Sequence, residues 1–324
     1  MTISWILLNL TAAAVLLIWA VRMVQTGVQR AHGPLIRRTL KSTNAHPLLM
    51  TVFGVLLAII FQSSTAVAVL TAGFVSSGFI TSSVGVATVL GADLGSALVI
   101  QILSFNLTWL APVCLIVGGI LFFKGKRRNF KQTGRILVGV ALILISLRLL
   151  AESTAPLRQN DFVPIVVNYL TSDPITTFLF GAVFTWLIHS SIASLLLIVA
   201  FVAQAIIPID VAAALVLGAN TGGAFIAVIL ARNLNTRGQV VPLSNFCLRG
   251  VSAILVLAII HILGTPTILS NFSPVQQIVS FHIGFNMLLV VIGLPFVKPI
   301  TAVLLKIISD RRINNDQPLS SRQS

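Results

Sequence analysis

Apolar stretches and short polar segments alternate along most of the chain. Seven apolar stretches come close to the ~20 residues that an α-helix needs to cross a bilayer. They are Ile3–Val24, Val84–Leu103, Thr108–Phe123, Ile136–Leu150, Val211–Ala231, Leu243–Leu263 and Val275–Val297. The pattern therefore predicts an all-α polytopic membrane protein with about seven full spans.

Two further apolar stretches, Pro47–Ile80 and Pro174–Ile207, are interrupted near their middle by polar residues. The segment before the first interruption, Pro47–Phe61, would form only ~22 Å of helix, which is less than the ~30 Å hydrocarbon core. We therefore expect both stretches to be re-entrant helical hairpins with polar tips. Non-helical backbone at that depth is tolerated only where protein buries it or where it lines a wet cavity.

Charge supports this topology. Only 9% of the residues are charged, and 21 Lys and Arg face 7 Asp and Glu, for a net charge of +14. The cations cluster in short segments between apolar runs, which favours contacts with lipid headgroups over binding of nucleic acid.

The distribution of the cations predicts the orientation. If each hairpin returns to the side from which it entered, 19 of the 21 cations lie on one side of the membrane, counting Arg22 and Arg249 at adjacent helix ends. We assign that side to the cytoplasm. The N-terminus is then outside and the C-terminus cytoplasmic. No basic residue precedes the first apolar run, so we expect a first span rather than a cleaved signal peptide.

The chain repeats itself when it is shifted by 127 residues. Segment 54–103 then aligns with 181–230 without a gap, and the matches include two Ser-Ser pairs and two Gly-Ala-x-x-Gly segments. One hairpin is predicted to enter from each side, so the repeats are expected to be inverted, which is typical of secondary transporters with a site near the bilayer midplane. The predicted units are residues 1–125 (hairpin 47–80), 126–264 (hairpin 174–207), an extra span at 265–300 and a cytoplasmic tail at 301–324.

The two tips carry the candidate binding groups. The first tip reads Gln62-Ser63-Ser64-Thr65 and the second His189-Ser190-Ser191-Ile192-Ala193-Ser194. A broken helix exposes backbone N–H groups that attract anions and carbonyls that attract cations, and hydroxyls and amides provide both kinds of group. A tip could thus hold an oxyanion and a small cation together, with His189 donating to the substrate or titrating. The alternatives are a Ser-rich helix bend and a neutral His189 bonded to a carbonyl.

The Gly-Ala segments, interpreted as turns, add two further candidates. Asp93 is the only carboxylate deep in a predicted span, and Asn220 is its equivalent in the second repeat. Acids inside a membrane are costly and usually functional, so Asp93 is expected to ligate Na⁺ or carry a proton, or else to pair with a hydroxyl or a helix end. Ser, His and Asp are the residues of a hydrolase triad, but the chain has no Gly-x-Ser-x-Gly elbow. We therefore expect no enzyme, and keep a hydrolase and a channel as alternatives.

At these residues the chain resembles the type II sodium/phosphate cotransporter family, in a bacterial short form without a PhoU-like domain. The resemblance rests on Gln62–Thr65, on Gly218-Ala219-Asn220-Thr221-Gly222 and on Phe281-His282-Ile283-Gly284-Phe285-Asn286. It implies Na⁺-coupled transport of inorganic phosphate by alternating access, in a bacterial inner membrane. The implied substrate-binding residues are Gln62, Ser63, Ser64, Thr65, His189, Ser190, Ser191 and Ser194. The Na⁺ candidates are Gln62, Ser64, Asp93, Ser191, Asn220 and Thr221.

The chain departs from the family pattern at several positions, including those after Gly95 and Gly222, which lack the usual Thr pair. His189 replaces a Gln, Ile192 a Ser and Asp93 an Asn. These changes keep open transport of another oxyanion or an organic anion, and export of phosphate. The expected partners are inorganic phosphate and the lipid bilayer, and a homodimer is also left open.

Overall fold

The structure is a computed structural model that describes residues 3–40, 46–105, 107, 109–159, 162–264 and 269–316. All regular elements in these ranges are helices, as the apolar pattern predicts. Six of the helices are long and apolar enough to cross a membrane, which confirms a polytopic membrane protein. Some residues used in the predictions lie outside the described ranges: Lys41, Thr108 and residues 317–324 of the predicted tail, which include Arg322.

Helices α2 (Pro47–Phe61), α3 (Ser64–Ser76) and α4 (Ser82–Leu103) form the first hairpin and the long helix that follows it. Their lengths of 15, 13 and 22 residues return in α8 (Pro174–Ile188), α9 (Ser191–Ala203) and α10 (Ile209–Leu230). Both helix breaks are therefore confirmed where the polar residues interrupt the apolar pattern. The opposite orientation of the two copies stays a prediction.

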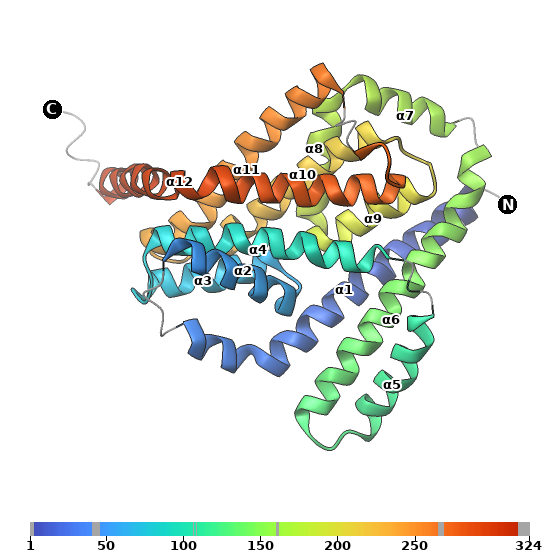
Figure 1. The fold of residues 1–324 in the computed structure, drawn as a ribbon, viewed down its shortest axis with the longest axis horizontal. Coiled ribbons are helices and arrows are strands. Elements are labelled where there is room, and N and C mark those ends of the chain that lie inside the picture. Colours follow the sequence, from blue (N-terminus) through green and yellow to red (C-terminus); the bar gives the residue numbers. More distant parts are fainter. Residues whose placement is uncertain are drawn as a thin grey trace.

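The remaining helices surround these two groups. They are α1 (Ile3–Leu40), α5 (Leu110–Lys124), α6 (Arg128–Thr154), the 3₁₀ helix η1 (Ala155–Gln159), α7 (Phe162–Ser172), α11 (Thr236–Leu263) and α12 (Pro274–Asp316). Figure 1 shows α5 and α6 as a hairpin beside α1, and α12 running alongside α4, in agreement with the contacts between these helices. The chain thus places α4, α9 and α10 in its interior.

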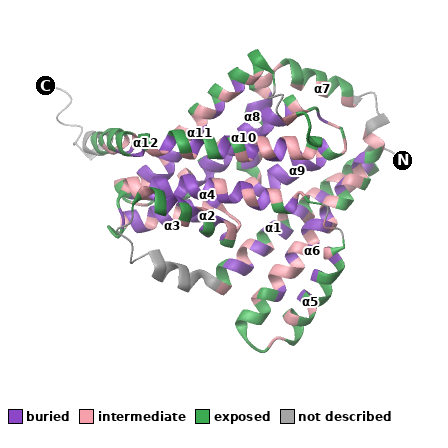
Figure 2. Cartoon of the chain, viewed as in Figure 1, coloured by how far each residue is buried: buried purple, intermediate pink, exposed green. Residues whose placement is uncertain are grey.

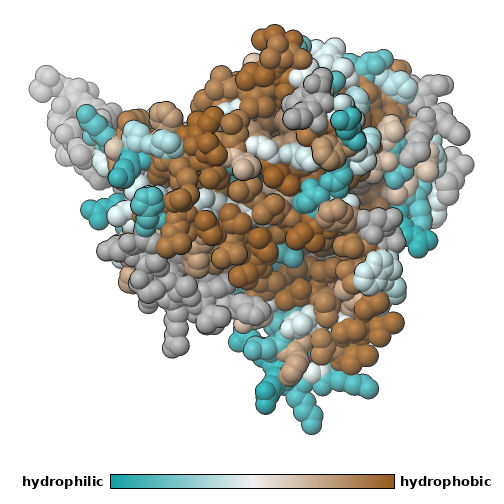
Figure 3. Space-filling view, viewed as in Figure 1, coloured by the Kyte–Doolittle hydropathy of each residue, from teal (hydrophilic) through white to brown (hydrophobic). Residues whose placement is uncertain are grey.

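The two long repeat helices are the most buried of the candidate spans. In both α4 and α10, 78% of the most apolar window is buried, against 33% or less in the other four. Figure 2 shows this as a buried centre enclosed by partly exposed helices. The surface is largely apolar in Figure 3, and large side chains such as Phe123 and Ile262 are 83% and 78% exposed. Such a surface suits contact with lipid.

Glycines let each hairpin lie close against the long helix that follows it. A Cβ atom at Gly91 would lie 1.9 Å from the carbonyl oxygen of Thr51, and one at Gly218 would lie 2.0 Å from that of Phe178. The 127-residue shift relates these two contacts to each other. Small residues that bring backbones together in this way are a common means of packing membrane helices.

Four sequence predictions need correction. The Gly-Ala segments are not turns, since α4 and α10 run through them without a break. The predicted loop 27–46 is helical as far as Leu40. The predicted span Thr108–Phe123 corresponds to α5, which has 15 residues and falls short of a full crossing. Arg22 and Arg249 lie within α1 and α11 rather than at their ends, because the helices extend beyond the apolar stretches.

Substituting Gly218 by Ala tests the packing of α8 on α10. The new methyl group would meet the Phe178 carbonyl, so we expect the free energy of unfolding to fall by about 1–3 kcal/mol. Thermal unfolding in detergent, followed by tryptophan fluorescence, measures the effect. Gly119→Ala on α5 is the matched control, because a Cβ there meets nothing within 4 Å and alanine favours helix. Equal melting temperatures for the two variants would contradict this packing.

Candidate functional site

The two hairpin tips share one backbone conformation. Gln62 (φ 50°) and His189 (φ 57°) are left-handed and end α2 and α8. The next residue in each tip, Ser63 or Ser190, is extended and caps the following helix by accepting the N–H of Ala66 (3.1 Å) or Ala193 (3.3 Å). A serine cap satisfies one of the four free N–H groups at a helix start, so each cap leaves further N–H groups of α3 or α9 that it does not satisfy.

Helix α1 holds both tips. The side-chain amide of Gln25 donates to the backbone carbonyl of Gln62 (2.9 Å), and the guanidinium of Arg22 donates to the carbonyl of Ile188 (3.0 Å). Residues three apart lie on the same face of a helix. The ends of α2 and α8 therefore approach the same part of α1, and Arg22 brings a positive charge to the second tip.

Both tips open into a single cavity of about 840 Å³. Ser63 and Thr65 of the first tip and His189 of the second line it, and Gln29 of α1 adds a polar wall. From the tips the cavity follows α3 to Ser77 and Phe79, in the segment that joins α3 to α4. Hydroxyl groups, an imidazole and the start of a helix thus face the same space.

The other predicted tip residues are more enclosed. Ser64, Ser190 and Ser194 are buried, and the Ser194 hydroxyl donates to the Ser190 carbonyl (3.1 Å). Gln62 and Ser191 are half-buried. The structure therefore brings Ser63, Thr65 and His189 together at the cavity and places the other tip residues behind or beside them.

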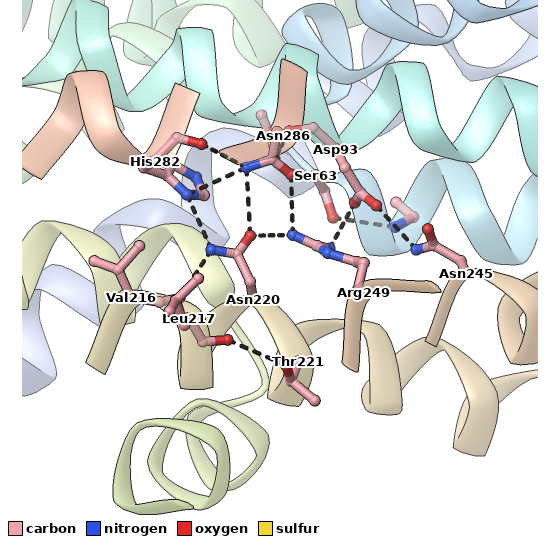
Figure 4. Close-up of polar contacts among 12 residues, drawn as sticks. Ser63, Asp93, Val216, Leu217, Asn220, Thr221, Asn245, Arg249, His282 and Asn286 are labelled. Atoms are coloured by element: carbon pink, nitrogen blue, oxygen red, sulfur yellow. Dashed lines mark hydrogen bonds and ion pairs between the residues drawn. The ribbon is translucent and has the colours of Figure 1, made fainter. Parts of the chain in front are cut away.

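Asp93 belongs to a separate buried cluster. Its Oδ1 lies 2.8 Å from Nη1 of Arg249, and its Oδ2 accepts a hydrogen bond from the Asn245 amide (2.9 Å). Asp93 and Arg249 are 3% and 4% exposed. Figure 4 shows the guanidinium between Asp93 and Asn220, and its Nη2 donates to Oδ1 of Asn220. A buried charge is tolerated when it is paired and hydrogen-bonded in this way.

The cluster continues from Asn220 into α12. A guanidinium only donates, so it faces the Asn220 oxygen and leaves the Asn220 nitrogen to donate to Nδ1 of His282 (3.0 Å). Asn286 also donates to that Nδ1 (3.2 Å). His282 is therefore neutral with its proton on Nε2, an atom that is buried and has no partner in the described part of the chain. Thr221, the remaining Na⁺ candidate, donates to the Leu217 carbonyl (3.1 Å).

Sequence reasoning missed the polar residues of α1 and α11. Arg22, Gln25 and Gln29 recur at three- and four-residue spacing in an apolar helix, and Asn245 and Arg249 are four apart. Such spacing places polar groups on one helix face and could have identified both sets. The charges were instead assigned to topology.

Comparison with known proteins gives a consistent family. The Na⁺/Pi-cotransporter family pattern matches residues 16–152 and 159–298. The protein YjbB of Escherichia coli (strain K12), named for inorganic phosphate export, is 32% identical over 94% of this chain and 56% of its own length. YqeW of Bacillus subtilis, which is named as uncharacterized, is 26% identical over 90% of this chain and 94% of its own. This chain spans about half the length of the YjbB relatives that it matches. No solved structure matches it.

Neutralising Asp93 and Arg249 separately and together tests the buried ion pair. Asp93→Asn or Arg249→Gln alone leaves an unpaired buried charge and should lower the free energy of unfolding by about 3–5 kcal/mol. The double variant should recover much of that loss. Arg148→Gln with Glu152→Gln is the control, because that pair is exposed and should matter little. Additive losses from the two buried substitutions would contradict direct pairing.

Proposed function

Because this chain belongs to the Na⁺/Pi-cotransporter family, we propose that it is a secondary transporter that moves inorganic phosphate across a bilayer with Na⁺ as the coupling ion. The observation that carries the proposal is the single cavity lined by both hairpin tips. A site shared by two repeats is what alternating access requires, because a relative movement of the repeats can expose it to either side.

The tips have the chemistry that phosphate needs. Free N–H groups at the start of α3 favour an anion, and the Ser63 and Thr65 hydroxyls can donate to its oxygens. Arg22, bonded to the second tip, adds a positive charge, and His189 adds a further polar group. The remaining tip residues, Gln62, Ser64, Ser190, Ser191 and Ser194, complete the proposed substrate site.

Sodium is proposed to bind beside the phosphate. Hydroxyl and amide oxygens are suitable ligands for a hard cation, and the candidates near the tips are Gln62, Ser64 and Ser191, with Thr221 on α10. Asp93 and Asn220 are already engaged by Arg249. Coupling at the tips would therefore use uncharged oxygen ligands together with the charge of phosphate itself.

Topology assigns a direction to the cavity. If the units 1–125 and 126–264 are inverted and the cation-rich segments are cytoplasmic, the segment from Ser77 to Phe79 lies at the cytoplasmic side. The cavity that reaches this segment then represents a state open to the cytoplasm of a bacterial inner-membrane protein.

Export of phosphate is the second candidate, and it is favoured by the names of the YjbB relatives. Import and export would use the same site and differ in the direction of the ion gradient that drives phosphate transport. The two are distinguished by reversing the gradient rather than by altering the site.

Transport by purified protein in proteoliposomes tests both candidates. With radioactive phosphate and an inward Na⁺ gradient, we expect uptake well above a choline control. Uptake driven only by an outward gradient would favour export, and no Na⁺ dependence in either direction would contradict Na⁺ coupling. Thr65→Val removes one cavity hydroxyl and should raise KM for phosphate about tenfold, the effect of losing one hydrogen bond to a charged group.

Thr133→Val is the matched control, because Thr133 is exposed on α6 and bonded to the carbonyl of Asn129. It should leave KM unchanged. A similar change in KM for both threonine variants would remove Thr65 from the site.

A further inference from the structure

The guanidinium of Arg249 lies between equivalent positions of the two repeats. Asp93 and Asn220 are related by the 127-residue shift and follow Gly-Ala in α4 and α10. Nη1 of Arg249 bonds to Asp93, and Nη2 of the same side chain bonds to Asn220. One side chain from α11 therefore joins the two copies at corresponding points, as Figure 4 shows.

The atoms around this guanidinium are oxygens from three helices. Asp93 of α4 contributes Oδ1, Asn220 of α10 contributes Oδ1, and Asn286 of α12 contributes Oδ1 at 3.3 Å from Nη2. Asn245 adds a buried Oδ1 that has no hydrogen-bond partner in the described residues. One carboxylate and several amide oxygens form the type of ligand set that hard cations bind in proteins.

We infer that these oxygens form a cation site between the repeats, and that Arg249 occupies it permanently as a tethered cation. A mobile Na⁺ would neutralise Asp93 in the same way, but it could leave during a transport cycle. The guanidinium cannot leave, because it is covalently attached and only 4% exposed. Asp93 and Asn220 then contribute no exchanging ion in this chain.

The inference predicts a gain of function when the tether is removed. Arg249→Ala leaves Asp93 unpaired and opens space among the oxygens, so a small cation should enter and stabilise the protein. Binding to the native state raises the melting temperature, and the stabilisation grows with the logarithm of one plus the ligand concentration over Kd. This part of the inference needs no transport, whereas its consequence for coupling rests on the proposed function.

Thermal unfolding of purified protein in NaCl and in choline chloride at equal ionic strength tests the site. We expect Na⁺ to raise the melting temperature of Arg249→Ala by about 5 °C more than that of the unsubstituted protein. Asp93→Asn with Arg249→Ala should lose this added response, because the carboxylate is gone. Arg148→Ala, which breaks the exposed pair with Glu152, should respond like the unsubstituted protein.

Two results would overturn the inference. One is an equal Na⁺ response in Arg249→Ala and in the unsubstituted protein. The other is an Arg249→Ala variant that remains unfolded in NaCl while the double variant folds, because Na⁺ would then fail to replace the guanidinium. In proteoliposomes that transport phosphate, the Hill coefficient for Na⁺ should rise by about one in Arg249→Ala. This measurement alone depends on the proposed function. If the Hill coefficient does not rise while the thermal response to Na⁺ is intact, the result counts against the coupling role only.

Discussion

Two broken helices inside an apolar protein create backbone groups that the protein itself has to satisfy. At each break, the chain satisfies only some of the carbonyl groups that end one helix and the N–H groups that begin the next. Serine caps and α1 engage the tips through Ser63, Ser190, Gln25 and Arg22. The first N–H groups of α3, whose start lines the cavity, keep their capacity to bind. This capacity suits an anion, because it lies at the positive end of a helix. The proposed phosphate site follows from this arrangement, since the same breaks that need support also supply the binding groups.

A second constraint acts on charge. An unpaired carboxylate at the depth of Asp93 would be costly, and Arg249 neutralises it from another helix. The two repeats differ here, because the equivalent residue Asn220 is uncharged and shares the same guanidinium. The polar interior therefore has two separate parts. Polar groups of both tips line an open cavity. The Arg249 cluster is enclosed and joins α4, α10, α11 and α12.

The helix breaks and the repeat could be predicted from sequence because each depends on local pattern. Polar residues interrupt the apolar stretches at Gln62 and His189, and a constant shift aligns the copies. The partner of Asp93 could not be found this way, because Arg249 is distant in sequence and the pairing depends on how α11 packs on α4. The prediction of turns at the Gly-Ala segments is wrong for a related reason. Glycine is also the residue that allows two backbones to touch, and only the packing of α2 and α8 distinguishes the two uses.

If phosphate occupies the cavity between the two tips, as proposed, it should protect a cysteine placed in that cavity. Ala66 lines the cavity, so Ala66→Cys, in protein with Cys114 and Cys247 replaced by Ala, places a reactive thiol there. We predict that phosphate slows alkylation of this thiol several-fold. A thiol introduced by Thr133→Cys, at an exposed position of α6, should react at the same rate with and without phosphate. An alkylation rate at position 66 that phosphate does not change, in protein that still transports phosphate, would place the phosphate site elsewhere.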